Sequence, residues 1–308
     1  MNMEAFILGC GGMMPLPYRH LTSVLLRREG ELFLFDGGEG TQVSLRRLNL
    51  KWKKINAIFI SHTHADHVTG IPGLMMLSSQ VERDEPLYIY GPPKIAEYIE
   101  SSRKVLDMYI NYPVIVKEIT APCICHEGDG FYIRAFPLQH TKICVGYTLE
   151  ELDRPGQFFP EKALALNVPC GPLWSKLQAG NEVESSDGTI VKPEQVMGEK
   201  RSGRKFSYVT DTMYLPSIAK EVQGSDLLIC EGMFSNEFEE QAKEKKHMTS
   251  IQAATVARDA NVKKMGLIHY SPRYTDYELK NLLKEAQSIF PKTVLTKDRM
   301  IFEIPYED

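Results

Sequence analysis

Short apolar runs recur along most of the chain, each broken after a few residues by glycine, proline or polar side chains. Runs of this length, bounded by turn-forming residues, favour buried strands. The runs that predict strands are 3–8, 21–26, 31–35, 57–60, 87–90, 114–119, 131–136, 206–209, 227–230 and 265–268. Helical spacing occurs between them, at 70–80, 94–106 and 250–260, and Thr249 is the expected N-cap of the last helix. Strands that alternate with helices in this way predict an α/β fold.

The polar segment that best indicates a chemical function follows the apolar run 57–60. The segment Ser61-His62-Thr63-His64-Ala65-Asp66-His67 places three imidazoles and a carboxylate in one short turn. Open α/β sheets bind ligands beyond the carboxyl ends of their strands, and neutral imidazole and carboxylate are the usual ligands of zinc and its neighbours. A solvated histidine-rich loop is the alternative, but so many imidazoles beside a buried strand are costly to place without a metal.

Within this turn, the spacing separates two pairs of candidate ligands. His62 and His64 lie two residues apart and can share one metal if the local backbone is extended. Asp66 and His67 are offset from them and can serve a second metal. The turn can therefore serve one metal or two.

Further titratable side chains lie at the ends of later strand runs. These are His140, Asp211, Glu231 and His269. Any one of them alone is more commonly a hydrogen-bonded structural residue, but together with the H-x-H-x-D-H turn they indicate a ligand set at one edge of the sheets. Asp36, after the run 31–35, has two equally good interpretations: a carboxylate that orients a ligating imidazole, or a turn or N-cap residue.

Composition narrows the class of protein. The 308 residues, 43% of them hydrophobic, suffice for one large α/β domain or two small ones. Because 36 Lys and Arg oppose 40 Asp and Glu, for a net charge of −4, a nucleic acid has to be held by a local basic patch. No signal-peptide pattern, bilayer-length apolar run or disulfide framework of the six cysteines is found, so we expect a reduced cytoplasm and no membrane contact. Cys123-Ile124-Cys125-His126 lacks the second half of a zinc finger and is interpreted as an incidental loop.

The chain changes character between Glu150 and Arg204. Prolines and glycines interrupt any long periodicity there, and hydrophobic residues are sparse. Insertions of this length are usually functional or disordered, and we interpret 150–204 as an arm inserted into the domain. It ends in a basic group that is either a solvated loop or a phosphate contact: Lys200, Arg201, Arg204 and Lys205.

These motifs together resemble ribonuclease Z, the tRNA 3′-processing endonuclease family of the metallo-β-lactamase superfamily. The H-x-H-x-D-H turn with the later His140, Asp211 and His269 is typical of the superfamily. The narrower matches are Phe6-Ile7-Leu8-Gly9, Leu34-Phe35-Asp36, Gly38-Glu39-Gly40-Thr41-Gln42, Gly70-Ile71-Pro72-Gly73-Leu74, Ile89-Tyr90-Gly91-Pro92, Gly171-Pro172-Leu173 and His269-Tyr270-Ser271-Pro272-Arg273-Tyr274. The resemblance implies a four-layer αβ/βα sandwich over 1–308 as a single domain. The arm at 150–204 then corresponds to an exosite that grips the elbow of a tRNA precursor, and a homodimer is expected.

The resemblance also implies roles for single residues. The implied ligands are His62, His64 and His140 for one zinc, Asp66, His67 and His269 for the other, and Asp211 as the bridge. A hydroxide activated by the metals would attack the phosphodiester, with Asp66 orienting or deprotonating the water. His247, paired with Glu231, would protonate the leaving oxygen. The products are a tRNA 3′-hydroxyl and a trailer 5′-phosphate, and Mn²⁺ or Fe²⁺ fits the same ligands as Zn²⁺.

Two other functions remain compatible with these residues. The first is a hydrolase of the same superfamily that acts on a small phosphodiester or an ester. The segment 150–204 and its basic end favour RNA over a small substrate. The second is a non-catalytic RNA-binding relative, and the intact ligand set argues against it.

Overall fold

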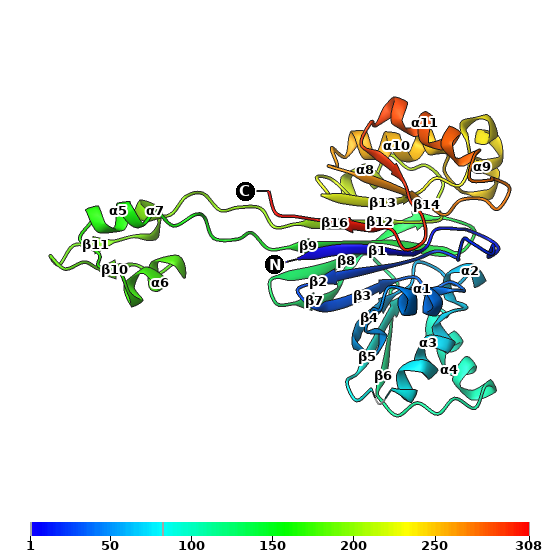
Figure 1. Ribbon diagram of the computed structural model, residues 1–308, viewed down its shortest axis with the longest axis horizontal. Coiled ribbons are helices and arrows are strands. Elements are labelled where there is room, and N and C mark those ends of the chain that lie inside the picture. Colours follow the sequence, from blue (N-terminus) through cyan, green and yellow to red (C-terminus); the bar gives the residue numbers. More distant parts are fainter. Residues whose placement is uncertain (1, 82, 308) are drawn as a thin grey trace. The chain divides into compact units, whose positions relative to one another are not determined.

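Two seven-stranded sheets form the centre of the computed structural model, which describes residues 2–81 and 83–307 (Figure 1). Sheet 1 has the order β16-β1-β2-β3-β4-β5-β6, with β1 (Met3–Gly9), β2 (Ser23–Arg28), β3 (Glu31–Phe35), β4 (Ile55–Phe59), β5 (Leu87–Gly91), β6 (Val114–Glu118) and β16 (Ile301–Glu303). Sheet 2 has the order β15-β14-β13-β12-β9-β8-β7, with β7 (Cys123–Gly128), β8 (Phe131–Gln139), β9 (Ile143–Glu151), β12 (Lys205–Val209), β13 (Leu227–Glu231), β14 (Met265–Ile268) and β15 (Thr293–Leu295). The strand runs expected from the sequence are confirmed. The expectation for Cys123-Ile124-Cys125-His126 was wrong, because these residues lie in β7 and not in a loop.

Helices cover the outer face of each sheet (Figure 1). Beside sheet 1 lie α1 (Thr41–Arg47), η1 (Trp52–Lys54), α2 (Ala65–Val68), α3 (Ile71–Gln80) and α4 (Ile95–Val105). Beside sheet 2 lie α8 (Ile218–Glu221), η2 (Asn236–Phe238), α9 (Glu239–Lys245), α10 (Ser250–Asp259) and α11 (Leu279–Ile289). Thr249 caps α10 as expected, in a capping box with Gln252. The order helix, sheet, sheet, helix confirms the expected four-layer α/β sandwich.

Side-chain alternation along the central strands divides the core into layers. In β3, Phe33 and Phe35 belong to the cluster between the two sheets, and Leu34 belongs to the cluster under α1–α4. In β4, Phe59 likewise belongs to the cluster between the sheets, and Ile58 belongs to the cluster under the helices. Because successive side chains of a strand point to opposite faces, strands buried on both faces carry the continuous apolar runs seen in the sequence.

Strand direction brings the polar strand ends together. β3, β4, β5 and β6 are parallel neighbours, and so are β12, β13, β14 and β15. The segments that follow these strands therefore leave each sheet at one edge. β9 runs antiparallel to β12, and the chain enters it from β8 through a short turn, so the end of β8 lies at the same edge.

The chain divides into two compact units, named here unit 1 (Met1–Glu150 and Arg204–Pro305) and unit 2 (Glu151–Gly203 and Tyr306–Asp308). Unit 2 contains α5 (Pro160–Ala165), α6 (Pro172–Gln178), β10 (Val183–Glu184), β11 (Ile190–Val191) and α7 (Pro193–Val196). It has a small core of its own, made of Ala163, Val168, Leu177, Val183, Val191 and Val196. This core leaves no periodic pattern in the sequence, because its members are spread singly over very short elements.

Among the described residues, no helix combines the length and the apolar character needed to span a bilayer.

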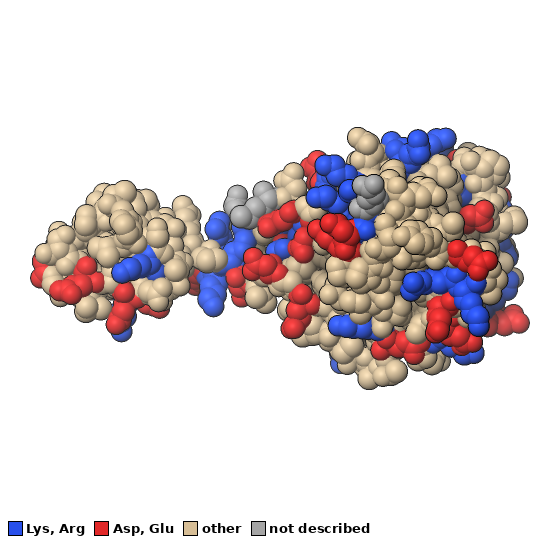
Figure 2. Space-filling view, turned by 90° about the horizontal axis from the view of Figure 1, so that it is seen from below, with Lys and Arg blue, Asp and Glu red and all other residues tan. Residues whose placement is uncertain are grey.

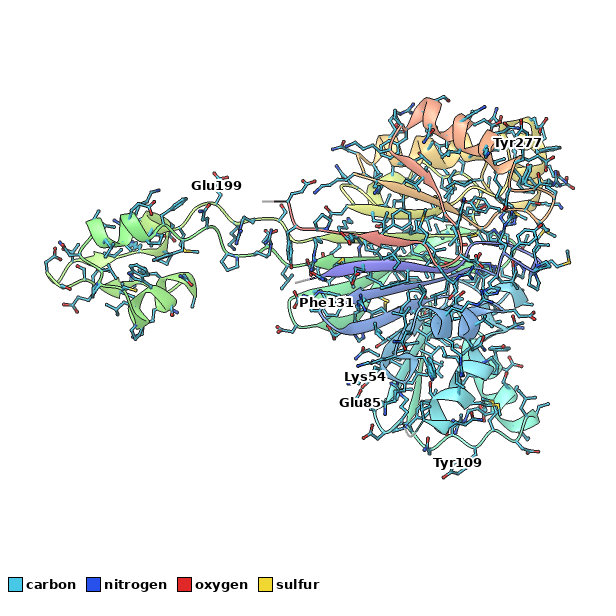
Figure 3. All side chains as sticks on the ribbon, viewed as in Figure 1. Lys54, Glu85, Tyr109, Phe131, Glu199 and Tyr277 are labelled. Atoms are coloured by element: carbon cyan, nitrogen blue, oxygen red, sulfur yellow. The ribbon has the colours of Figure 1, made fainter. Side chains whose placement is uncertain are left out.

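Removing an aromatic ring from between the sheets should destabilise the fold. Phe33 is fully buried and packs against Phe59 and Phe131, with ring centroids 6.3 and 5.4 Å away. Phe33→Ala should lower the free energy of unfolding by about 3–5 kcal/mol, because it deletes buried surface and leaves a cavity. Tyr109, in the loop after α4, is 82% exposed (Figure 3), and Tyr109→Ala should change it by less than about 0.5 kcal/mol. Equal losses in urea titrations of both variants would contradict this account.

Candidate metal centre

The H-x-H-x-D-H turn connects β4 to the short helix α2. His64 has extended backbone angles, φ −73° and ψ 150°, and immediately precedes α2. The extended geometry lets His62 and His64 converge, as expected from their spacing, and the helix then carries Asp66 and His67 to a second position. The local backbone thus divides the four side chains into two pairs.

The first group of possible ligands combines the turn with two strands of sheet 2. Its members are His62, His64, His140 and Asp211. His64 Nδ1 lies 2.9 Å from His62 Nε2 and 3.3 Å from His140 Nε2. Asp211 Oδ2 lies 3.6 Å from His62 Nε2 and 3.7 Å from His140 Nε2. All four side chains thus turn a ligand atom toward one point.

The second group faces the other oxygen of the same carboxylate. It contains Asp66, His67 and His269. His67 Nε2 and His269 Nε2 lie 3.2 Å apart, and Asp211 Oδ1 lies 3.3 and 3.2 Å from them. Asp66 Oδ2 lies 3.4 Å from His269 Nε2. Asp211 therefore lies between the two groups, with one oxygen toward each.

Hydrogen bonds on the outer side of two rings determine which nitrogen faces inward. His67 Nδ1 lies 2.7 Å from the Asp36 carboxylate, and His140 Nδ1 lies 2.9 Å from the carbonyl oxygen of Lys246. Both partners only accept, so Nδ1 carries the proton in each ring and, in the neutral ring, Nε2 keeps a free lone pair. Ligating imidazoles in proteins are oriented in this way.

The electrostatics of the first group favour neutral imidazoles. Burial, the largest cause in each case, lowers the pKa of His62, His64 and His140 below the usual histidine value. A neutral imidazole is the form that binds a metal. These three rings are therefore ready to coordinate at neutral pH.

The second group has an excess of negative charge. Burial lowers the pKa of His67, but the carboxylates of Asp211 and Asp36 outweigh it and raise that pKa well above the usual value. For Asp66, burial raises the pKa, but the His269 hydrogen bond and the charge of His67 outweigh it and lower that pKa far below the usual value. A buried position that attracts a proton so strongly also attracts a metal cation.

The donor set and its spacing fit two divalent metals. Two nitrogens that each lie 2.0–2.1 Å from one tetrahedral zinc lie roughly 3.3 Å apart. The nitrogen separations in the two groups, 2.9, 3.3 and 3.2 Å, are close to this value. Imidazole and carboxylate suit zinc, and they also suit iron and manganese. The residues therefore fit the metals that the resemblance implies.

His247 and Glu231 form a buried pair beside the two groups. His247 Nδ1 lies 3.1 and 3.2 Å from the two carboxylate oxygens, and its ring centroid is 4.8 Å from that of His140. Burial lowers the pKa of His247, but Glu231 outweighs it and raises the pKa to about 9. His247 is thus protonated at neutral pH. One of its ring nitrogens also lies within 4.8 Å of ligand atoms of Asp211 and His269.

Asp36 is a partner of the centre and not a helix cap. The N-cap of α1 is Gly40, and the Asp36 carboxylate accepts hydrogen bonds from the Ser61 backbone and hydroxyl, each at 2.7 Å. Of the two interpretations of Asp36, the structure supports the one in which it orients an imidazole.

Sequence reasoning missed three partners of the centre. Tyr208 Oη donates to Asp36 at 2.8 Å, the Met13 backbone N–H donates to Asp66 Oδ2 at 2.7 Å, and Lys246 offers its carbonyl oxygen to His140. The contacts of Met13 and Lys246 come from the backbone, so side-chain identity carries no signal for them. Tyr208 lies three residues before Asp211, and its identity alone fits an ordinary core position.

The basic group interpreted as either a solvated loop or a phosphate contact does not form one exposed patch. Arg204 is only 2% exposed, and its guanidinium donates to the carbonyl oxygen of Ile304. Lys205 lies in β12 beside Glu150, at 3.4 Å. Lys200 is exposed and Arg201 half-buried, and both belong to unit 2. Figure 2 shows Lys and Arg mixed with Asp and Glu on the visible face of unit 1. The burial of Arg204 argues against its expected role in phosphate contact.

Two family models match parts of the chain. The model described as "Anti-Pycsar protein Apyc1" matches residues 3–107, and the model described as "Beta-lactamase superfamily domain" matches residues 185–270. Together they cover most of the strands whose ends carry the candidate ligands.

Solved structures share the fold. Human tRNase Z, short form, is 26% identical with a TM-score of 0.71, covering 98% of this chain and 99% of the human one. The metallo-beta-lactamase fold protein YhfI from Bacillus subtilis is 21% identical with a TM-score of 0.69, covering 98% of this chain and all of YhfI. The chain therefore has the metallo-β-lactamase fold.

Curated relatives match the chain over its whole length. A protein of Treponema denticola named Ribonuclease Z is 71% identical over 308 residues, covering all of both chains. Ribonuclease Z of Treponema pallidum (strain Nichols) is 68% identical, covering all of this chain and 99% of its own. Ribonuclease Z of Borreliella burgdorferi (strain ZS7) is 42% identical, covering 98% and 97%. With identities this high over matching lengths, the chain belongs to the ribonuclease Z family and is a metal-dependent hydrolase of the endoribonuclease class.

Proposed function

We propose that this chain is a zinc-dependent endoribonuclease that removes 3′ trailers from tRNA precursors, leaving a 3′-hydroxyl on the tRNA and a 5′-phosphate on the trailer. The observation that carries the proposal is the position of Asp211, one oxygen of which faces each histidine group. The 71% identity to a protein named Ribonuclease Z and the similarity to human tRNase Z support tRNA as the substrate.

Seven side chains would hold two metals. The proposed ligands are His62, His64 and His140 for one metal, Asp66, His67 and His269 for the other, and Asp211 for both. When bound, two such cations lower the pKa of a water and stabilise the negative charge that develops on the phosphate.

Asp66 and His247 would handle the protons. Asp66, fixed by the Met13 N–H, orients the attacking water and accepts its proton. Glu231 keeps His247 protonated, so that His247 can give its proton to the leaving 3′ oxygen as the P–O3′ bond breaks. His247 is then a proton donor and not a metal ligand.

Unit 2 would act as the tRNA-gripping exosite. Residues 151–203 contain six Lys and Arg and eight Asp and Glu, so binding has to depend on the placement of a few cations and not on net charge. Lys200 is such a position, next to Glu199 (Figure 3). The proposed enzyme is a homodimer and acts in the cytoplasm.

Cleavage should depend on bound metal. Purified protein incubated with a 3′-extended tRNA precursor should produce one new end at the tRNA 3′ boundary. Dialysis against EDTA should abolish cleavage and addition of Zn²⁺ should restore it, because imidazole sites release metal to a strong chelator. End mapping and metal analysis check this. Full activity in protein shown to be free of metal would contradict the proposal.

Replacing the proposed proton donor should slow cleavage without removing metal. His247→Ala should lower kcat by roughly 10²–10⁴-fold, the usual contribution of general acid catalysis, with two metals still bound per chain. His126→Ala is the control, because His126 pairs with Tyr90 and contacts none of the ligands. Loss of metal from the His247 variant would reassign this residue as structural.

Removing unit 2 should separate the cleavage of tRNA precursors from the hydrolysis of a small phosphodiester. The backbones of Arg154 and Arg201 are hydrogen-bonded to each other at 2.7 and 3.0 Å, so the segments that enter and leave unit 2 run side by side. A short Gly-Ser link between Leu152 and Arg201 can therefore replace Asp153–Lys200 with little strain. The deletion should abolish pre-tRNA cleavage and spare hydrolysis of bis(p-nitrophenyl) phosphate. Equal loss of both activities would contradict the exosite role, and efficient hydrolysis of the small ester alone by the intact protein would favour a small substrate.

A further inference from the structure

The Asp36 carboxylate is a junction of hydrogen bonds inside the protein. It is fully buried and follows β3 with a positive φ of 54°, a conformation that side chains other than glycine seldom adopt. Oδ1 accepts from the Ser61 backbone at 2.7 Å. Oδ2 accepts from the Ser61 hydroxyl, the His67 ring and the Tyr208 hydroxyl, at 2.7, 2.7 and 2.8 Å.

Tyr208 is the donor among these that comes from the opposite sheet. Asp36, Ser61 and His67 all lie at the end of sheet 1, whereas Tyr208 lies in β12 of sheet 2. Its ring is fully buried and packs against Phe35, with centroids 5.6 Å apart. The phenol thus crosses the interface between the sheets and ends on the carboxylate that holds His67.

We propose that Tyr208 is a positioning residue of the metal centre, which acts through Asp36 on His67. This inference rests on the proposed function, because it takes His67 as a metal ligand. With three donors on Oδ2, the carboxylate has one orientation, and the His67 ring is held with Nε2 toward Asp66, Asp211 and His269. Without the phenol, Oδ2 keeps only the Ser61 hydroxyl and the His67 ring as donors, and no group of sheet 2 helps to fix the orientation of the carboxylate.

In this role, Tyr208 gives sheet 2 a second contribution to the metal centre, in addition to Asp211. Asp211 follows β12 three residues after Tyr208. One strand therefore supplies the carboxylate that faces both groups and the hydroxyl that fixes the outer partner of His67. A small shift of β12 changes the position of Asp211 and the orientation of His67 together.

A neighbouring tyrosine provides a matched control. Tyr147 in β9 is the register partner of Tyr208, is equally buried and also packs against Phe35. Its hydroxyl donates to the carbonyl oxygen of Ile60 at 2.7 Å and not to Asp36. Replacing either tyrosine by phenylalanine removes one buried hydroxyl from the same aromatic cluster.

The test measures Zn²⁺ affinity of metal-free protein by competition with a chelating dye. Tyr208→Phe should weaken one of the two sites by about ten-fold or more, the usual effect of losing an outer partner of a ligand. It should also lower kcat for pre-tRNA with KM unchanged. Tyr147→Phe should keep both affinities within about two-fold of wild type, with a loss of thermal stability in the metal-free state comparable to that of Tyr208→Phe.

The outcomes separate this inference from the proposed function. Wild-type affinity at both sites in Tyr208→Phe, or equal weakening in both variants, would overturn the positioning role alone. A wild-type protein that binds no zinc would overturn the proposed function and this inference with it. Selective weakening in Tyr208→Phe, with its unfolding temperature matched by Tyr147→Phe, would support the role.

Discussion

The metal centre depends on one electrostatic interaction: buried carboxylates are stable only beside positive charge. Asp36, Asp211 and Glu231 are almost completely removed from water, and an unpaired carboxylate in such a place is very costly. In the metal-free protein, His67 and His247 meet part of this need, because the carboxylates raise the pKa of both rings. Metal cations at the two histidine groups would meet the rest.

The architecture concentrates these charges at one place without weakening the core. Each proposed metal ligand follows an apolar strand, so the strand interiors remain free for packing and the ligand atoms gather at one edge. At this edge, the backbone also passes very close to side chains and to other backbone segments. A Cβ at Gly12 would lie 2.6 Å from the His269 ring, and one at Gly70 would lie 2.4 Å from the Gly38 carbonyl oxygen. Glycine at these two positions leaves room for the second group and for the start of α3.

Much of this arrangement could be predicted from the sequence because its signals are local. The alternation of apolar runs indicated the α/β class, and the ends of those runs identified the side chains that meet at the edge. Contacts between the sheets left no such signal. Tyr208 looks like any core aromatic residue, and the amide of Met13 is invisible in a pattern of side chains. Arg204 was misleading for a related reason, since its charge suggested an exposed position, whereas its side chain is buried and bonded to the carbonyl oxygen of Ile304. The core of unit 2 was also missed, because single valines on two-residue strands have no periodicity.

The proposed ligands are spread from His62 to His269, and this spread has a consequence for synthesis on the ribosome. A growing chain that stops short of residue 269 lacks the last imidazole, and one that stops short of residue 211 also lacks the carboxylate shared by both groups. Loop closure over more than a hundred residues makes the centre a late product of folding. Until residue 269 has been made, a growing chain of this RNA-cutting enzyme therefore lacks a complete set of proposed ligands beside the RNA-rich particle that makes it.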